Sequence, residues 1–252
     1  MSFLAAGIVF AFTAGGVLLG MWLHTVLPPS HKEPESKEVI KIATGLLATL
    51  AALVLGLLVA SAKSSFDAQE TGFQELAANV LVLDRLLSHC GPEADPARAA
   101  LRKAVESTVD HLWPANGTPA TALDNEQISA AGHAAYAAIR DMSPKDDAAR
   151  AVQSQALAMT TDLARTRWML SEQHDSQSSI PFLIVLIFWL TVIYCSFGLF
   201  APRNGIALAV LLLCALSSAG AVFLIVDLNQ PNGGLIQVSS TPLRYALSQL
   251  GK

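Results

Sequence analysis

Three charged side chains that follow an apolar segment are the clearest candidates for chemistry in this chain. Lys63, Asp67 and Glu70 share one side of a helix at about 100° per residue, and Phe66 lies among them. Rings of charged side chains at the mouth of a pore select ions. The spacing makes these side chains candidates for the mouth of a pore, where two acids against one lysine would favour cations slightly.

A second candidate is Asp227 with Asn229, at the end of another apolar run. An acid at the end of a span lies at the membrane interface or has a function, because a carboxylate at membrane depth is costly. We interpret Asp227 first as part of a turn and second as an acid on an ion pathway. With Asn232 and Gly233 the spacing resembles a calcium loop, but Pro231 occupies the third ligand position and no glutamate closes it. A capped helix end is therefore favoured over a calcium site.

The cysteines and histidines form no pattern that carries chemistry. Cys195 and Cys214 lie inside apolar runs and Cys90 is the third cysteine, so no disulfide framework is indicated. The six histidines form no i, i+4 pair and have no Cys-x-x-Cys partner, which argues against zinc. No phosphate loop or catalytic triad spacing is present, and a net charge of -4 provides no basic patch. We predict no catalytic residue, metal, cofactor or nucleic-acid partner.

Four apolar blocks account for the unusual composition. Of the 252 residues 52% are hydrophobic and 14% charged, with a mean hydropathy of +0.46, which is too apolar for an ordinary soluble domain. Four blocks reach the roughly 20 residues that a span needs: Phe3 to Val26, Ile40 to Ala62, Ile180 to Ala201 and Ile206 to Val226. The first has no basic region before it and is longer than a signal-peptide core, so we interpret it as a retained span. The sequence predicts an all-α integral membrane protein with four transmembrane helices.

The second block is the start of one long helix. No helix breaker occurs before Gly91-Pro92, so a helix of roughly 50 residues is predicted. Its two sides differ in residue size. The leucine side comprises Leu46, Leu47, Leu50, Leu53, Val54, Leu57 and Leu58 and suits lipid. The other side, called here the small-residue stripe, comprises Gly45, Ala48, Thr49, Ala52, Gly56, Val59 and Ala60 and suits close contact with protein.

Beyond Ala62 the same helix changes to a pattern typical of water-soluble bundles. Phe66, Phe73, Val80 and Leu87 recur every seven residues. Three further helices with apolar stripes follow, and two of them have predicted starts, one at Asp95-Pro96 and one at Ser143-Pro144 with Asp146 and Asp147. We expect a first transmembrane hairpin over residues 1–62, a helical bundle over 63–179 that continues the second span, a second transmembrane hairpin over 180–227, and a tail with a short helix over 228–252. The tail, Thr241 to Leu250, is expected to fold back against the bundle.

Three separated segments resemble the bestrophin-like domain family of bacterial membrane proteins. They are ALVLGLLVASAKSSFD from Ala52 to Asp67, Leu83-Asp84-Arg85 with Gly91-Pro92-Glu93-Ala94, and DLNQPNGGLIQVSSTPLRYAL from Asp227 to Leu247. The resemblance implies a four-span subunit in the bacterial inner membrane, with the bundle and both termini in the cytoplasm. By more distant analogy to bestrophins it implies a homo-oligomer around an ion pore, for which a pentamer is one option. His89-Cys90 departs from the aromatic residue expected before Gly-Pro, and the acidic calcium clasp of bestrophins has no counterpart here.

Two functional hypotheses follow from these features. The first is an ion channel in which the small-residue stripe forms an apolar constriction and Lys63, Asp67 and Glu70 form its mouth, with the lipid bilayer and the transported ions as partners. An alternative role for the stripe is to pack against the first span through Gly16 and Gly20. The second hypothesis is a membrane-anchored sensor or interaction protein whose bundle binds a ligand or a partner.

Overall fold

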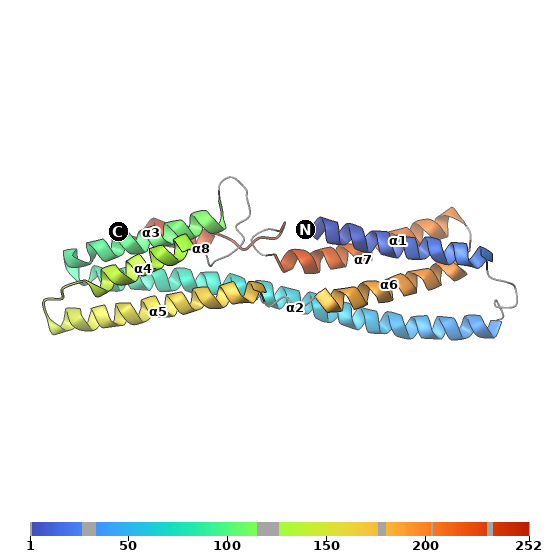
Figure 1. Ribbon diagram of the computed structural model, residues 1–252, viewed down its shortest axis with the longest axis horizontal. Helices are drawn as coiled ribbons and strands as arrows, with labels where there is room; N and C mark the ends of the chain where they lie inside the picture. The colour runs from blue at the N-terminus through green and yellow to red at the C-terminus, as the bar shows by residue number, and fades with distance from the viewer. Residues whose placement is uncertain are drawn as a thin grey trace. The chain divides into compact units, whose positions relative to one another are not determined.

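The computed structural model describes residues 2–26, 34–114, 126–175, 180–202, 204–230 and 234–251. Within these ranges the chain forms helices and no strand (Figure 1). In order they are α1 (Ser2–Val26), α2 (Pro34–Ser88), the short 3₁₀ helix η2 (Gly91–Ala94), α3 (Asp95–Leu112), α4 (Glu126–Arg140), α5 (Asp147–Asp175), α6 (Ile180–Phe200), α7 (Gly205–Leu228) and α8 (Thr241–Gln249). The all-α class is confirmed. Pro231, Asn232 and Gly233 of the calcium-like spacing lie outside the described residues.

Four helices, α1, α2, α6 and α7, are long and apolar enough to cross a membrane, which confirms the four predicted spans. The long central helix is confirmed as well, because α2 runs through 55 residues without a break. It ends where Gly91 adopts a φ of +74°, a conformation that glycine takes at little cost, and Pro92 follows. The chain forms two compact units, Met1–Ser64 with Gln177–Asn229 and Ser65–Ser176 with Gln230–Lys252, and α2 contributes to both.

The first unit is held together by the close packing of α1 against α6. A Cβ atom on Gly16 would lie 2.8 Å from the carbonyl oxygen of Thr191, and one on Gly20 would collide with the carbonyl oxygen of Cys195. On α6, Gly198 meets the backbone of Val17 in the same way. Small residues let the two backbones touch, which is how helices associate where water provides no driving force. Gly16 and Gly20 therefore do mark a contact face, and its partner is α6.

Side-chain hydrogen bonds add directional links between the spans of this unit. The hydroxyls of Thr44 on α2 and Ser196 on α6 lie 2.8 Å apart, and those of Tyr194 on α6 and Ser218 on α7 lie 2.9 Å apart. Each such bond within a membrane protein contributes about 0.6 kcal/mol on average. The core around them is formed by Val9, Val17, Ala51, Leu186, Leu190, Ile193, Tyr194, Ala215, Ala219 and Val222.

The second unit is a helical bundle built on the heptad positions of α2. The four predicted seam residues are all buried: Phe66, Phe73, Val80 and Leu87. The ring of Phe73 meets Trp113, at the end of α3, edge-on at a centroid distance of 5.3 Å. Leu101, Val105, Val109 and Leu112 of α3 are buried too. The seam prediction is thus confirmed.

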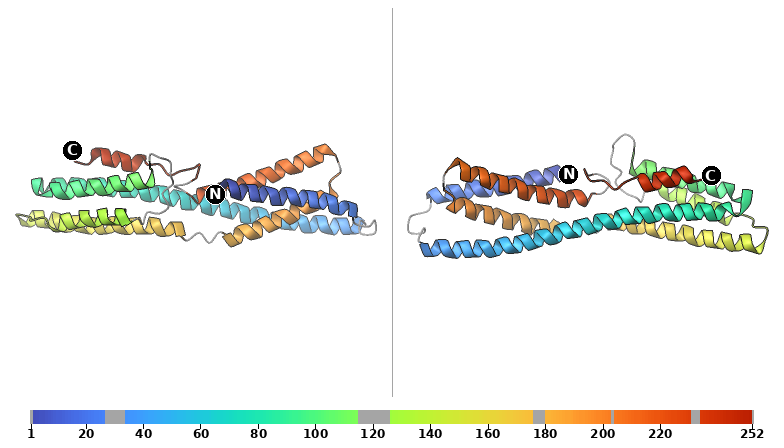
Figure 2. Two further views of the ribbon diagram at one scale, coloured as in Figure 1. Left: turned by 45° about the horizontal axis from the view of Figure 1, so that its top comes forward. Right: turned by 180° about the vertical axis from the view of Figure 1, so that it is seen from behind.

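The C-terminal segment packs on α3, as predicted for the tail (Figure 2). The indole N–H of Trp113 donates to the carbonyl of Val238 at 3.0 Å, and Nη1 of Arg102 donates to the carbonyl of Leu250 at 3.0 Å. Nearby, Arg98 of α3 forms a two-pronged ion pair with Asp84 of α2, at 2.8 and 3.0 Å. Hydrogen bonding to Asp84 raises the pKa of the Arg98 guanidinium. Hydrogen bonds and apolar burial together fix the tail on the bundle.

The two predicted helix starts have different outcomes. The start predicted around Asp146 and Asp147 is confirmed, because α5 begins at Asp147. The structure adds that the carboxylate of Asp146 caps this helix by accepting a hydrogen bond from the backbone N–H of Ala149 at 2.6 Å. The predicted cap at Asp95 is wrong by one residue, because Ala94 is the N-cap of α3 and no side chain caps that end. The reason is that η2 runs directly into α3, so the backbone is already helical at Ala94.

Candidate ion pathway on α2

The apolar part of α2 is the least covered of the four spans. In its most apolar stretch 6% of the residues are buried, against 28% for α1 and 22% for α6 and α7. A narrow line of α2 faces the core of its unit: Ala51 is buried there, and Leu47, Ala48, Leu55 and Leu58 are partly buried against it. The two sides of α2 that flank this line are open within a single chain.

The small-residue stripe forms one of these flanks. Five of its members are exposed and two are half-buried: Gly45, Thr49, Ala52, Gly56 and Ala60, then Ala48 and Val59. A Cβ atom added at Gly45 or Gly56 would meet nothing within 4 Å. The alternative that the stripe packs against the first span through Gly16 and Gly20 is wrong, because those two glycines lie against α6. The packing of the single chain therefore leaves most of the stripe uncovered.

The leucine side forms the other flank and is equally open. Leu46, Leu53 and Leu57 are between 60% and 65% exposed. Bulky aliphatic side chains gain little from close helix contact in a bilayer, because lipid tails solvate them as well as protein does. Residue size, and not exposure, therefore distinguishes the flank suited to lipid from the flank suited to another helix.

The predicted mouth residues do not all have the same environment. Lys63 and Asp67 are exposed, Glu70 is half-buried, and Phe66 is 7% exposed. Phe66 thus packs in the core of the bundle, in the heptad seam that also contains Phe73. The three charged members share one face of α2, since steps of three and four residues keep side chains on one helix face.

A cavity of about 420 Å³ lies between α2 and α6, at the end of the small-residue stripe that is nearer the start of α2. It is lined by Gly45 of the stripe together with Lys41, Thr44, Ser196, Phe197, Phe200 and Ala201. Sequence reasoning missed this cavity because Thr44 and Ser196 are 152 positions apart in the chain. The lysine one turn before Gly45 was a visible signal, since Lys41 is the only charge in that apolar run.

Asp227 is deeply buried in the last turn of α7, at 1% exposure. The helix ends immediately after it, where the backbone N–H of Asn229 donates to the carbonyls of Ile225 and Asp227. A carboxylate at the C-terminal end of a helix opposes the helix dipole, and a carboxylate buried to this degree needs polar partners. Such a residue in a spanning helix is by default a candidate functional acid.

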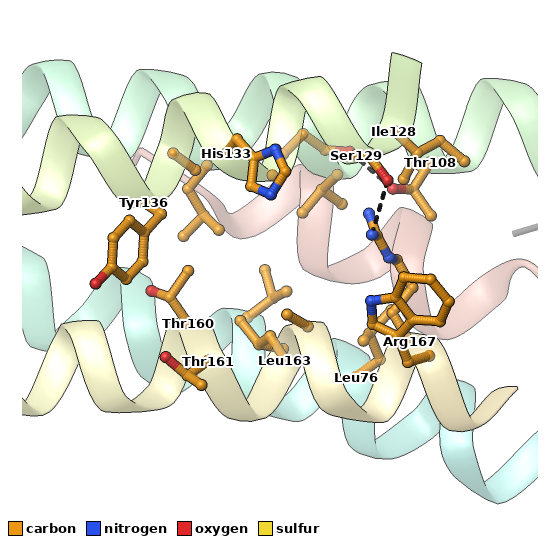
Figure 3. Close-up of a pocket in the computed structure, with 18 of the residues that line it drawn as sticks. Leu76, Thr108, Ile128, Ser129, His133, Tyr136, Thr160, Thr161, Leu163 and Arg167 are labelled. Atoms are coloured by element: carbon orange, nitrogen blue, oxygen red, sulfur yellow. Dashed lines mark hydrogen bonds between the residues drawn. The ribbon is translucent and has the colours of Figure 1, made fainter. Parts of the chain in front are cut away.

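The helical bundle contains a second pocket, of about 350 Å³, which the sequence did not predict (Figure 3). Arg167, Ser129 and Thr108 lie at one end, and Tyr136, Thr160 and Thr161 lie at the other. Apolar stripes in the sequence identify which helix faces are buried, but they do not show where the packed helices leave a cavity. The glycine inside α4, Gly132, was the one local signal, because glycine weakens a helix and its presence there needs a reason.

Among the described residues no group of three or more His, Cys, Asp or Glu side chains could hold a metal ion. The four apolar helices, with α2 shared between the span-containing unit and a helical bundle, define an integral membrane protein of the all-α class. The Bestrophin-like domain family matches residues 11–243, nearly the whole chain, and the chain belongs to this family. No curated protein and no solved structure matches it. The protein is thus a bestrophin-like membrane protein, as the three sequence segments indicated.

Proposed function

We propose that the chain is one subunit of a homo-oligomeric ion channel, and that the small-residue stripe of α2 lines the shared pore. Family membership supports a channel, and the uncovered stripe supplies a surface on which copies of the chain can meet. The observation that carries the proposal is that Gly45 and Gly56 of the stripe are open, whereas Gly16 and Gly20 of α1 are tightly packed against α6. The proposed assembly is a ring of identical subunits, for which a pentamer is one option.

The stripe would act as an apolar constriction. None of its seven residues carries a charge that could hold an ion, so a pore of this lining conducts when it is wet and closes when it dries. Lys63, Asp67 and Glu70 would form charged rings at its mouth, where the balance of two acids against one lysine favours cations. Lys41, in the cavity beside Gly45, would place a cation at the other end of the stripe.

Asp227 is proposed first as a structural residue at the end of α7 and second as an acid on the ion pathway. A buried carboxylate in a span contributes either an ion-binding site or an internal partner for the fold. The two roles are separable because Asp227→Asn keeps the shape and a hydrogen-bonding group but removes the charge. Loss of conductance with normal assembly supports the pathway role, and loss of both supports the structural role. The pathway role is rejected if assembly and conductance are both unchanged.

Our proposal for the membrane orientation is made by analogy to the family, because the charges near the spans do not decide it. We place the protein in the bacterial inner membrane with the bundle and both termini in the cytoplasm. The lysines and arginines near the spans are too evenly divided for the positive-inside rule to decide. Reporter fusions at the C-terminus test the placement: a fluorescent protein that folds only in the cytoplasm should be bright, and an active periplasmic phosphatase would contradict it.

Ion flux from liposomes tests the channel with a matched pair of substitutions. Ala52→Trp should block flux, because a bulky ring in a constriction of small residues closes it. Leu50→Trp is the control, since two positions rotate the side chain by about 200° to the leucine side. Lys63→Glu should increase cation flux relative to anion flux. Flux that responds equally to both tryptophans, or not at all, rules out the stripe as the pore lining.

A second candidate function is supported by the pocket in the helical bundle. A membrane-anchored sensor or interaction protein needs a site for a ligand or partner, and a cavity of about 350 Å³ falls within the usual range of about 300–1,000 Å³ for such sites. Absence of flux under all conditions, together with a monomeric protein, would favour this reading over the channel.

A further inference from the structure

The bundle pocket follows the line along which α4 and α5 run antiparallel. At one end, Nη2 of Arg167 on α5 donates to the hydroxyl oxygen of Ser129 on α4 at 3.0 Å (Figure 3). At the other end are Tyr136, seven residues further along α4, and Thr160, seven residues before Arg167 on α5. Seven helical residues span about 10 Å. The pocket is thus an elongated groove with polar groups at both ends.

Between its ends the pocket is apolar. Apolar side chains of four helices close its floor and walls. They are Leu76 and Val80 of α2, Leu101 and Val105 of α3, Ile128 of α4 and Leu243 of α8. No aspartate or glutamate of the described residues lines it. All of the lining belongs to the unit formed by Ser65–Ser176 and Gln230–Lys252. Its volume of about 350 Å³ is at the lower end of the range for ligand sites, which suits a molecule with one chain.

Arg167 supplies the charge that distinguishes this groove from a packing gap. The described residues give its guanidinium one hydrogen bond, to Ser129, and no carboxylate among them lies within 4.0 Å of it. The guanidinium faces α4 at Gly132, where an added Cβ would lie 3.8 Å from Nη1. A half-buried guanidinium with unused N–H groups is suited to a carboxylate, which it can bind with two parallel hydrogen bonds.

We propose that this pocket binds a single-chain carboxylate amphiphile, of the chemical class of a medium-chain fatty-acid anion. The carboxylate would pair with Arg167 and Ser129, and the alkyl chain would lie along Leu76, Val80 and Leu163 toward Tyr136. The positive charge of Arg167 favours an anionic ligand. No aspartate or glutamate among the described lining residues competes with the ligand for the guanidinium. The inference does not depend on the channel proposal, because the site lies wholly within the bundle.

Binding to the full chain in nanodiscs of zwitterionic lipid tests the proposal with three probes of equal chain length. Octanoate should bind more tightly than octanol, and octylammonium should not bind. Lengthening the carboxylate from butanoate to octanoate should tighten binding about fourfold per methylene, the factor that corresponds to about 0.8 kcal/mol per buried CH₂. Equal binding of octanoate and octylammonium overturns the proposal, because the charge preference would then be absent.

Two substitutions separate the pocket from simple partitioning into lipid. Arg167→Gln should weaken octanoate binding about tenfold or more and leave octanol binding unchanged, since it removes a charge-assisted hydrogen bond. Gly132→Leu should abolish binding of both probes by filling the groove, and it should not unfold α4, because leucine is a better helix former than glycine. Octanoate binding that survives Gly132→Leu in a protein with an unchanged melting temperature overturns the proposal.

Discussion

Replacing Phe73 is expected to unfold the helical bundle, because this side chain connects α2 to α3 in the core. The ring is 1% exposed and meets Trp113 at 5.3 Å, and Trp113 in turn holds the C-terminal segment through Val238. Truncation of a buried Phe to Ala costs about 3–5 kcal/mol, of which the aromatic pair accounts for about 1. Domains are stable by only about 5–15 kcal/mol, so Phe73→Ala should lower the melting temperature by about 10 °C. Phe73→Asp adds the burial of a carboxylate and should leave the bundle unfolded.

Thermal melting of the detergent-solubilised protein, followed by near-ultraviolet circular dichroism of the aromatic residues, measures this effect. Gln74→Asp is the matched control, because it introduces the same charge one residue away on the exposed side of α2. That control should change stability by less than about 0.5 kcal/mol. If Phe73→Asp and Gln74→Asp melt at the same temperature, the seam does not form the core of the bundle.

Three further outcomes are expected. Gly20→Ala should impair folding, because the added Cβ would collide with the backbone of α6. Gly56→Ala is the control, since its Cβ meets open space and the variant should fold normally. Equal expression and stability of the two variants would contradict the packing of α1 on α6. Burial raises the pKa of the Cys90 thiol, and the carboxylates of Asp146 and Glu93 raise it further. A higher pKa means that less of the thiol is present as the reactive thiolate near pH 8. Glu93→Gln removes one carboxylate, lowers the pKa of Cys90 and should speed its alkylation by a water-soluble maleimide at pH 8. An unchanged alkylation rate in that variant would count against the carboxylate effect. Asp227→Asn should impair assembly, as judged by size-exclusion chromatography, if the buried carboxylate is a structural part of the helix end. Normal assembly with altered flux, measured in parallel, would assign Asp227 to the ion pathway instead.

Much of the fold could be predicted because it depends on local patterns. The absence of a helix breaker before Gly91 predicted the length of α2, and the heptad spacing of Phe66 and Phe73 predicted which side of it is buried in the bundle. The start of α5 followed from Asp146, a residue whose side chain itself makes the capping bond. The start of α3 did not follow from Asp95, because η2 occupies the preceding turn and makes a side-chain cap unnecessary.

The candidate sites were harder to predict because they depend on which helices meet. The spacing of Gly16 and Gly20 predicted a contact face but not that α6 would occupy it. The line of α2 that faces the core, centred on Ala51, lies between the two sides that residue size distinguishes, so neither side could be assigned to internal packing. The bundle pocket arises where α4 and α5 leave a gap beside Gly132, and no helical periodicity encodes a gap.

Cysteine accessibility along α2 tests the central claim, that the small-residue stripe lines a shared pore, most directly. The experiment uses single-cysteine variants in a background without the three native cysteines. The cysteines replace Thr49, Ala52 and Gly56 on the stripe, and Leu50, Leu53 and Leu57 on the leucine side. Ion flux is measured before and after treatment with a charged, water-soluble thiol reagent. Modification should block flux at the stripe positions and have no effect at the leucine positions, so that the block repeats with the helical period. Block at the leucine positions, or no block at any of the six, would contradict the account.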